Sequence, residues 1–108
     1  MTEKFHNLMS LSNEEVKAKL NLETGKLTWP ELEQFFAKGV VICVDKKQDI
    51  IEVAAALAKD QASKIAELLE TKKIKKPDNE QAILWHQNKQ VFWAVVVAPW
   101  VVIQETDA

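Results

Sequence analysis

The sequence contains no arginine, and all 14 of its basic side chains are lysine. It therefore lacks the planar guanidinium fork that grips phosphate groups and guanine edges in two-point contacts, which argues against arginine-clamped phosphoryl transfer. The formal net charge is only -2, so the chain has no excess of positive charge for holding a polyanion. Nucleic acid is therefore not an expected partner.

Glycine and cysteine are also scarce. The two glycines cannot build a phosphate-binding loop or a dinucleotide fingerprint. The single cysteine, Cys43, cannot form an intramolecular disulfide, and its place in an apolar run is typical of a core residue in a reducing compartment. The longest apolar stretch, 91–103, is interrupted by Pro99 and is shorter than the roughly 18 to 20 residues that cross a bilayer. These features, together with a polar N-terminus, predict a cytoplasmic protein that does not enter membranes.

What the chain does contain is enough apolar material for one core. Its 108 residues are 47% hydrophobic and 28% charged, which is typical of a folded domain. No internal repeat or linker divides the sequence, so residues 1–108 are expected to form a single domain. The segment 1–11 is expected to be a mobile N-terminus.

Four sites carry the residues that start a helix. Each combines a capping side chain with a carboxylate or amide three residues later, a spacing that allows two reciprocal hydrogen bonds with backbone N–H groups. The pairs are Ser12 with Glu15, Thr28 with Glu31, Asp49 with Glu52 and Asp78 with Gln81. They predict helices over 13–23, 29–38, 50–69 and from Asp78 to 88, with Gly25 and Gly39 in left-handed turns that end the first two.

The helix expected over 50–69 carries two apolar stripes on different faces, which indicates a break near Lys59 and Asp60. Whether this segment forms one helix or two is left open by the pattern. Two other stretches, 40–44 and 91–104, are rich in β-branched residues and are expected to be strands. The longer stretch has to bend at Pro99, and a bulge or a wide turn is expected because Ala98 and Pro99 do not favour positive φ.

These elements predict an α+β fold, with a small sheet from residues 40–44 and 91–104 packed by four or five helices. Both segments are apolar almost throughout, which predicts strands that are buried on both faces. One short chain is not expected to have enough helix to cover both faces, so a homodimer is predicted, with Trp93 and Trp100 as interface anchors.

Several blocks of the sequence, between residues 27 and 105, resemble a family of short bacterial proteins that is known only as a domain of unknown function. The resemblance is carried by Leu27-Thr28-Trp29-Pro30-Glu31-Leu32, Gly39, Asp49-Ile50-Ile51-Glu52-Val53-Ala54, Asp60, Ala82, Trp85 and, most specifically, the final block from Phe92 to Glu105, which includes Ala-Pro-Trp-Val-Val-Ile-Gln-Glu. It implies an uncharacterised bacterial protein and supplies no catalytic residue.

Three polar residues are candidates for chemistry. Asp45 and Asp60 flank the segment that follows the first strand, and His86 lies beside Trp85 on the last helix. Carboxylates and imidazole are ligands for divalent metals, but no second histidine or further acid stands at a metal-binding spacing. Asp49 and Glu52 are assigned to helix capping, and His86 is expected to be a partly buried residue bonded to backbone.

The function predicted from these residues is a non-catalytic interaction or regulatory module, with no cofactor. The alternative is a small metal-assisted enzyme, or a small-ligand binder, that uses Asp45, Asp60 and His86. The sequence identifies neither a substrate nor a protein partner.

Overall fold

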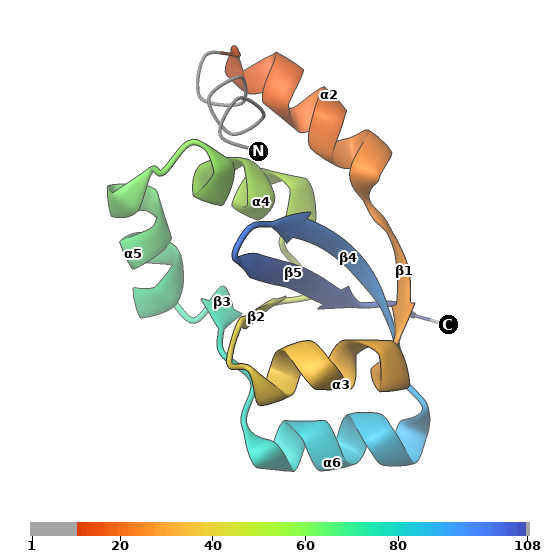
Figure 1. Cartoon of the computed structure of the whole chain (residues 1–108). Coiled ribbons are helices and arrows are strands. Elements are labelled where there is room, and N and C mark those ends of the chain that lie inside the picture. Colours follow the sequence, from red (N-terminus) through yellow and green to blue (C-terminus); the bar gives the residue numbers. More distant parts are fainter. Residues whose placement is uncertain (1–10, 108) are drawn as a thin grey trace.

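The computed structural model describes residues 11–107 and shows the expected α+β fold (Figure 1). Of the expected mobile segment 1–11, all but Leu11 lies outside the described residues. The helices within the described part are α2 (Asn13–Glu23), α3 (Trp29–Ala37), α4 (Ile50–Ala58), α5 (Ala62–Glu70) and α6 (Asn79–Asn88). The strands are β1 (Gly25–Thr28), β2 (Val41–Val44), β3 (Ile74–Lys75), β4 (Val91–Val97) and β5 (Trp100–Glu105).

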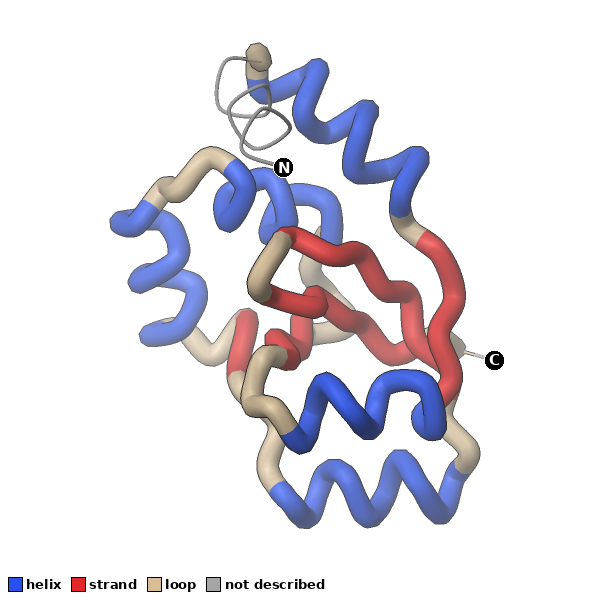
Figure 2. The backbone as a smooth tube through the Cα atoms, in the orientation of Figure 1, coloured by secondary structure: helices blue, strands red, loops and turns tan. Residues whose placement is uncertain are grey.

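The strands form one mixed sheet in the order β1-β4-β5-β2-β3. The central pair, β4 and β5, is an antiparallel hairpin, and β5 runs parallel to β2. Figure 2 shows this hairpin in the middle of the molecule, with the shorter strands on either side. The two expected strand segments are therefore confirmed, and they supply the three inner strands of the sheet.

Helices of the same chain cover both faces of the sheet. The α4 face, packed by α2, α4 and α5, carries inward-pointing residues such as Val44, Val95 and Val102. The α3 face, packed by α3 and α6, buries Trp29, Trp85 and a different set of strand residues. Helices of one chain thus pack on both faces, contrary to the expectation, but the cover of β4 is incomplete, since Trp93 is 40% exposed and Val96 is 62% exposed.

Two strands and one turn differ from the expectations. Gly25 begins β1, which pairs with β4, so it does not end α2 in a left-handed turn. β3 lies inside the lysine-rich stretch 72–76, where the sequence predicts no strand, and pairs with β2. Val97 pairs with Trp100, so Ala98 and Pro99 form a two-residue loop instead of a wide turn. Neither residue has a positive φ, and the peptide bond between them is cis.

The four predicted helix starts are confirmed, with two changes in side-chain bonding. Ser12 and Glu15 form the full reciprocal pair, and Glu31 accepts hydrogen bonds from both the N–H and the hydroxyl of Thr28. Asp49 and Asp78 cap α4 and α6 by accepting backbone N–H bonds, as expected.

The partners expected to reach back to those two caps bond elsewhere. The Glu52 carboxylate accepts from Lys17 at 2.7 Å and from Lys64 at 3.4 Å. These bonds, the one from Lys17 foremost, lower the pKa of Glu52. The Gln81 amide donates to Glu105 at 3.4 Å. At both sites, a hydrogen bond to a residue distant in the sequence thus replaces the expected capping bond.

Candidate functional site

The helix α5 is amphipathic but has no buried side chain. Ala62, Ile65, Ala66 and Leu69 recur at the spacing of one helical face. The preceding helix α4 buries six of its nine residues, whereas Leu69 in α5 is still 52% exposed. The apolar face of α5 therefore lies against the body of the protein without being sealed by it.

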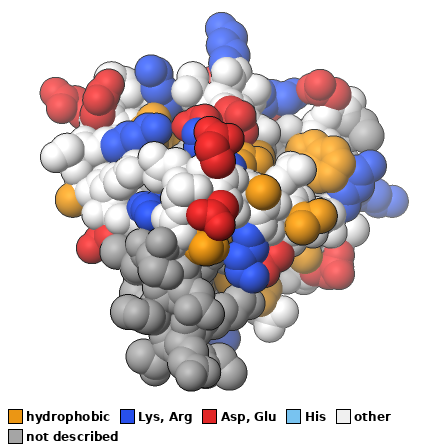
Figure 3. All heavy atoms as spheres, turned by 90° about the horizontal axis from the view of Figure 1, so that it is seen from above, with side chains coloured by type: hydrophobic (Ala, Val, Ile, Leu, Met, Phe, Trp, Pro, Cys, Tyr) orange, Lys and Arg blue, Asp and Glu red, His pale blue; other side chains and the backbone are white. Residues whose placement is uncertain are grey.

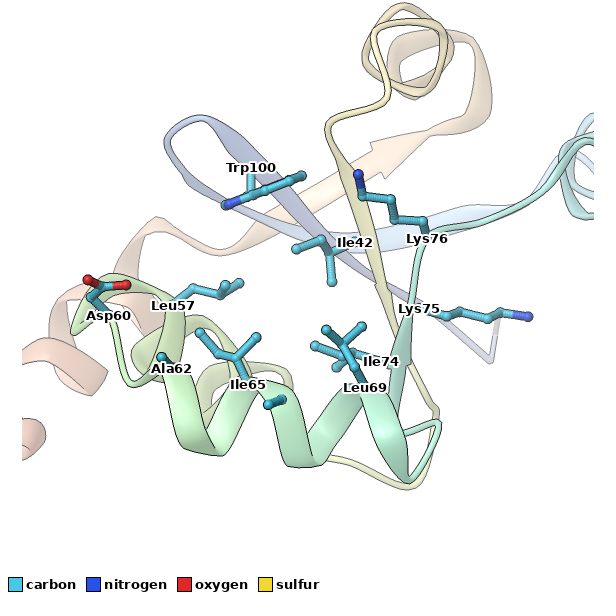
Figure 4. A pocket seen from close by; sticks show the side chains of 11 residues that line it. Ile42, Leu57, Asp60, Ala62, Ile65, Leu69, Ile74, Lys75, Lys76 and Trp100 are labelled. Atoms are coloured by element: carbon cyan, nitrogen blue, oxygen red, sulfur yellow. The ribbon is translucent and has the colours of Figure 1, made fainter.

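A groove of about 460 Å³ runs along this face of α5 and is called the α5 groove below (Figure 4). Its floor is formed by Ile42 of β2 and Ile74 of β3, and Leu57 of α4 and Trp100 of β5 close it from other sides. The volume lies within the range of small-molecule sites, which are mostly apolar with a few polar groups. The α5 groove is thus the apolar candidate site of the described chain.

Charged side chains mark the ends of the α5 groove. In Figure 4, Asp60 lies at the start of α5, while Lys75 and Lys76 lie near its far end. The Lys76 ammonium is 5.2 Å from the centre of the Trp100 ring, a cation–π contact, whereas the Lys75 ammonium points away from the groove. The groove therefore has one negative end and one positive end.

Asp60 also has a structural role. It adopts a left-handed conformation, with φ of 53°, directly after α4. Its N–H bonds to the carbonyl of Leu57, and the N–H of Gln61 bonds to that of Ala56, which is the bond pair of a Schellman helix end. The expected break near Lys59 and Asp60 is confirmed, and the segment 50–69 forms two helices.

Asp45 lies at a different place, after β2, in a second hollow of about 340 Å³. Its carboxylate accepts the N–H of Lys47 at 3.1 Å, so it ends the strand with a local turn. The hollow is also lined by Lys46, Lys72, Lys73 and Lys75, with Glu105 as the other acid. This concentration of ammonium groups opposes the binding of a divalent cation.

His86 lies on α6, which packs on the α3 face, whereas Asp60 follows α4 on the α4 face. The expectation of a partly buried histidine is wrong, because α6 buries only Ala82 and Trp85 and leaves His86 exposed. Among residues 11–107, no three histidine, cysteine or acidic side chains are placed to hold a metal ion together. The three sequence candidates therefore do not form one site.

The thiol of Cys43 is buried on the α3 face. Burial is the main cause that raises its pKa to about 12, so the thiol is neutral at physiological pH. This agrees with the assignment of Cys43 as a core residue.

The sequence interpretation missed the α5 groove, although it contained the signal. The apolar residues after Asp60 centre on a different face from those before it, and this change was used only to place a helix break. A helix with a clear apolar face and no buried side chain is visible only when the packing is known. Of the earlier candidates, Asp60 and Trp100 line this groove.

Comparison with known proteins supports the fold and identifies the family. The NMR solution structure of PA1075 from Pseudomonas aeruginosa is similar to this chain, with a TM-score of 0.76 and 41% sequence identity over 93% of each chain. No curated protein matches the chain. In the part that the structure describes, no helix has the length and apolar character needed to span a membrane. Residues 15–105 match the model of a family described as protein of unknown function (DUF2288), and the chain therefore belongs to that family.

Proposed function

We propose that the protein is a non-catalytic interaction module and that the α5 groove is its binding site. The observation that carries this proposal is the apolar face of α5, which lines an open groove instead of a sealed core. An apolar group that enters the groove would remove this surface from water, a gain of about 25 cal/mol for each Å² buried. The ligand is thus expected to be held mainly by its apolar part.

Two observations support a non-catalytic role over the metal-assisted alternative. Asp45, Asp60 and His86 occupy three separate places, and both aspartates help to shape the backbone. The Cys43 thiol is buried and protonated, which makes it a poor nucleophile. Small-ligand binding remains part of the proposal, with Asp60 as the one member of that trio at the groove.

The test of this proposal is to fill the groove. Ala66 is exposed and lines it, so Ala66→Phe would place a ring in the space that a ligand needs. Ser63→Phe is the matched control, because Ser63 lies on the same helix but lines a different hollow. With 1-octanol as a neutral probe, the indole N–H signal of Trp100 in a nitrogen–proton NMR spectrum should shift in the wild type and in Ser63→Phe, but not in Ala66→Phe. Equal responses in all three proteins would contradict the proposal.

A homodimer and a bacterial cytoplasmic location are also proposed. Trp93 is 40% exposed on β4, with the Lys26 ammonium 5.3 Å from its ring centre, and it is the better placed anchor for a second copy. Trp100 faces the α5 groove instead. The source of the similar PA1075 structure supports a bacterial origin, and the single buried thiol is typical of a reducing compartment.

A further inference from the structure

We infer that the α5 groove takes a single-chain amphiphile whose anionic head lies beside Lys76. This inference rests on the proposed function, since it names the class of ligand for the same groove.

The lining favours an alkyl chain over an extended peptide. The walls are formed by aliphatic side chains and one indole, and the polar side chains at the groove belong to Asp60, Lys75 and Lys76 at its ends. A peptide backbone would bring N–H and C=O groups into a site whose walls offer few partners, and an unpaired polar group is costly to bury. An alkyl chain has no polar group to satisfy.

The charges orient the head group. Lys76 has no acidic partner among the described residues, and its ammonium is held over the Trp100 ring. At the opposite end, the Asp60 carboxylate lines the groove and repels an anion. An anionic head is therefore expected beside Lys76 and away from Asp60, with the uncharged tail toward Asp60.

The length of the apolar face is suited to a chain of medium length. From Ala62 to Leu69 the helix rises by about 10 Å, at 1.5 Å per residue. A ten-carbon tail is of comparable length, so the decyl series provides suitable probes. These are decanoate, 1-decanol and decylammonium, each used below the concentration at which it forms micelles.

The experiment measures the dissociation constant of each probe from the Trp100 indole signal, which Trp100→Phe assigns by its loss. All three probes are expected to bind, and decanoate is expected to bind more tightly than decylammonium. Lys76→Gln should weaken decanoate about two- to fivefold, the size of an exposed charge contact, and leave 1-decanol unchanged. Lys75→Gln is the matched control, since this ammonium points away from the groove, and it should leave decanoate binding nearly unchanged.

The outcomes separate this inference from the proposed function. If decanoate binds no more tightly than decylammonium, or if Lys75→Gln weakens it as much as Lys76→Gln does, the inferred head-group contact is wrong while the apolar groove stands. If none of the probes shifts the Trp100 signal, both the inference and the proposed function fail. Retention of the other amide signals in each variant shows that the fold is intact.

Discussion

The hydrogen bond between Trp85 and Glu105 provides a quantitative test of how α6 is attached to the sheet. Trp85 is 1% exposed, and its indole Nε1–H donates to the Glu105 carboxylate at 2.7 Å. A hydrogen bond to a charged group contributes about 1.5 to 3 kcal/mol. Glu105→Ala removes the acceptor and leaves the N–H buried, so it should lower the free energy of unfolding by about this amount. Glu105→Gln keeps an acceptor oxygen and should cost less.

Thermal unfolding provides the assay. In a domain of this size, 1 kcal/mol corresponds to about 4 to 8 °C in Tm, so Glu105→Ala should lower the Tm by about 6 to 24 °C. Trp85→Phe and the double variant complete a thermodynamic cycle that isolates the bond from the loss of packing. A coupling energy near zero, with Glu105→Ala as stable as the wild type, would refute this reasoning.

Trp29 offers an internal comparison for the same experiment. It is 4% exposed in the same core cluster, and its ring centre is 5.9 Å from that of Trp85. Within the described residues its buried Nε1–H has no hydrogen-bond partner. Trp29→Phe therefore removes a similar volume but loses no hydrogen bond, and it should destabilise the protein less than Trp85→Phe.

Four further predictions concern other parts of the chain. Lys72 follows α5 and has a φ of 60°. Lys72→Gly should raise the free energy of unfolding, measured with a chemical denaturant, by about 0.5 to 1 kcal/mol, because glycine adopts positive φ without strain. A lower free energy of unfolding would contradict this. The Cys43 thiol should react with a thiol-specific reagent at pH 8 only on unfolding, since burial raises its pKa to about 12; rapid labelling of the native protein would show otherwise. Backbone N–H groups of Ser12 and Thr28 donate to Glu15 and Glu31 and lower the pKa of both carboxyl groups from 4.5. The stabilisation from these bonds is therefore complete above pH 4.5 and is lost as the pH falls through the lowered pKa values. In Glu15→Gln, the free energy of unfolding should fall less steeply as the pH is lowered below 4.5. Sedimentation should detect a dimer that Trp93→Ala weakens, and a single 12.3 kDa species at every concentration would rule it out.

Local signals in the sequence were sufficient for most of the fold. Capping residues fixed the start of α2, α3, α4 and α6, because they act within one turn of helix. The β-branched runs located β2, β4 and β5 for a similar reason, since side-chain crowding favours extended backbone at those residues. The four-residue β1 and the two-residue β3 lack such runs and are held by the strands beside them.

The candidate site was less predictable because it depends on packing between distant segments. The α5 groove combines Ile42, Leu57, Ile74 and Trp100, which no local pattern connects. The same limit applies to Glu52, whose partner Lys17 lies 35 residues away and displaces the expected capping bond. A local rule identifies the residues that can bond, whereas the tertiary fold decides which of them do.

The order of the strands has a consequence for how the chain is made. The centre of the sheet is the β4–β5 hairpin, which joins β1 on one side to β2 on the other. During synthesis, β1 and β2 leave the ribosome long before the strands that they pair with. The apolar β2 run must wait for residues 100–105 and is meanwhile open to aggregation. Folding is therefore expected to complete only after nearly the whole chain has emerged, and a nascent chain stalled before β4 should be degraded by proteases that spare the complete protein.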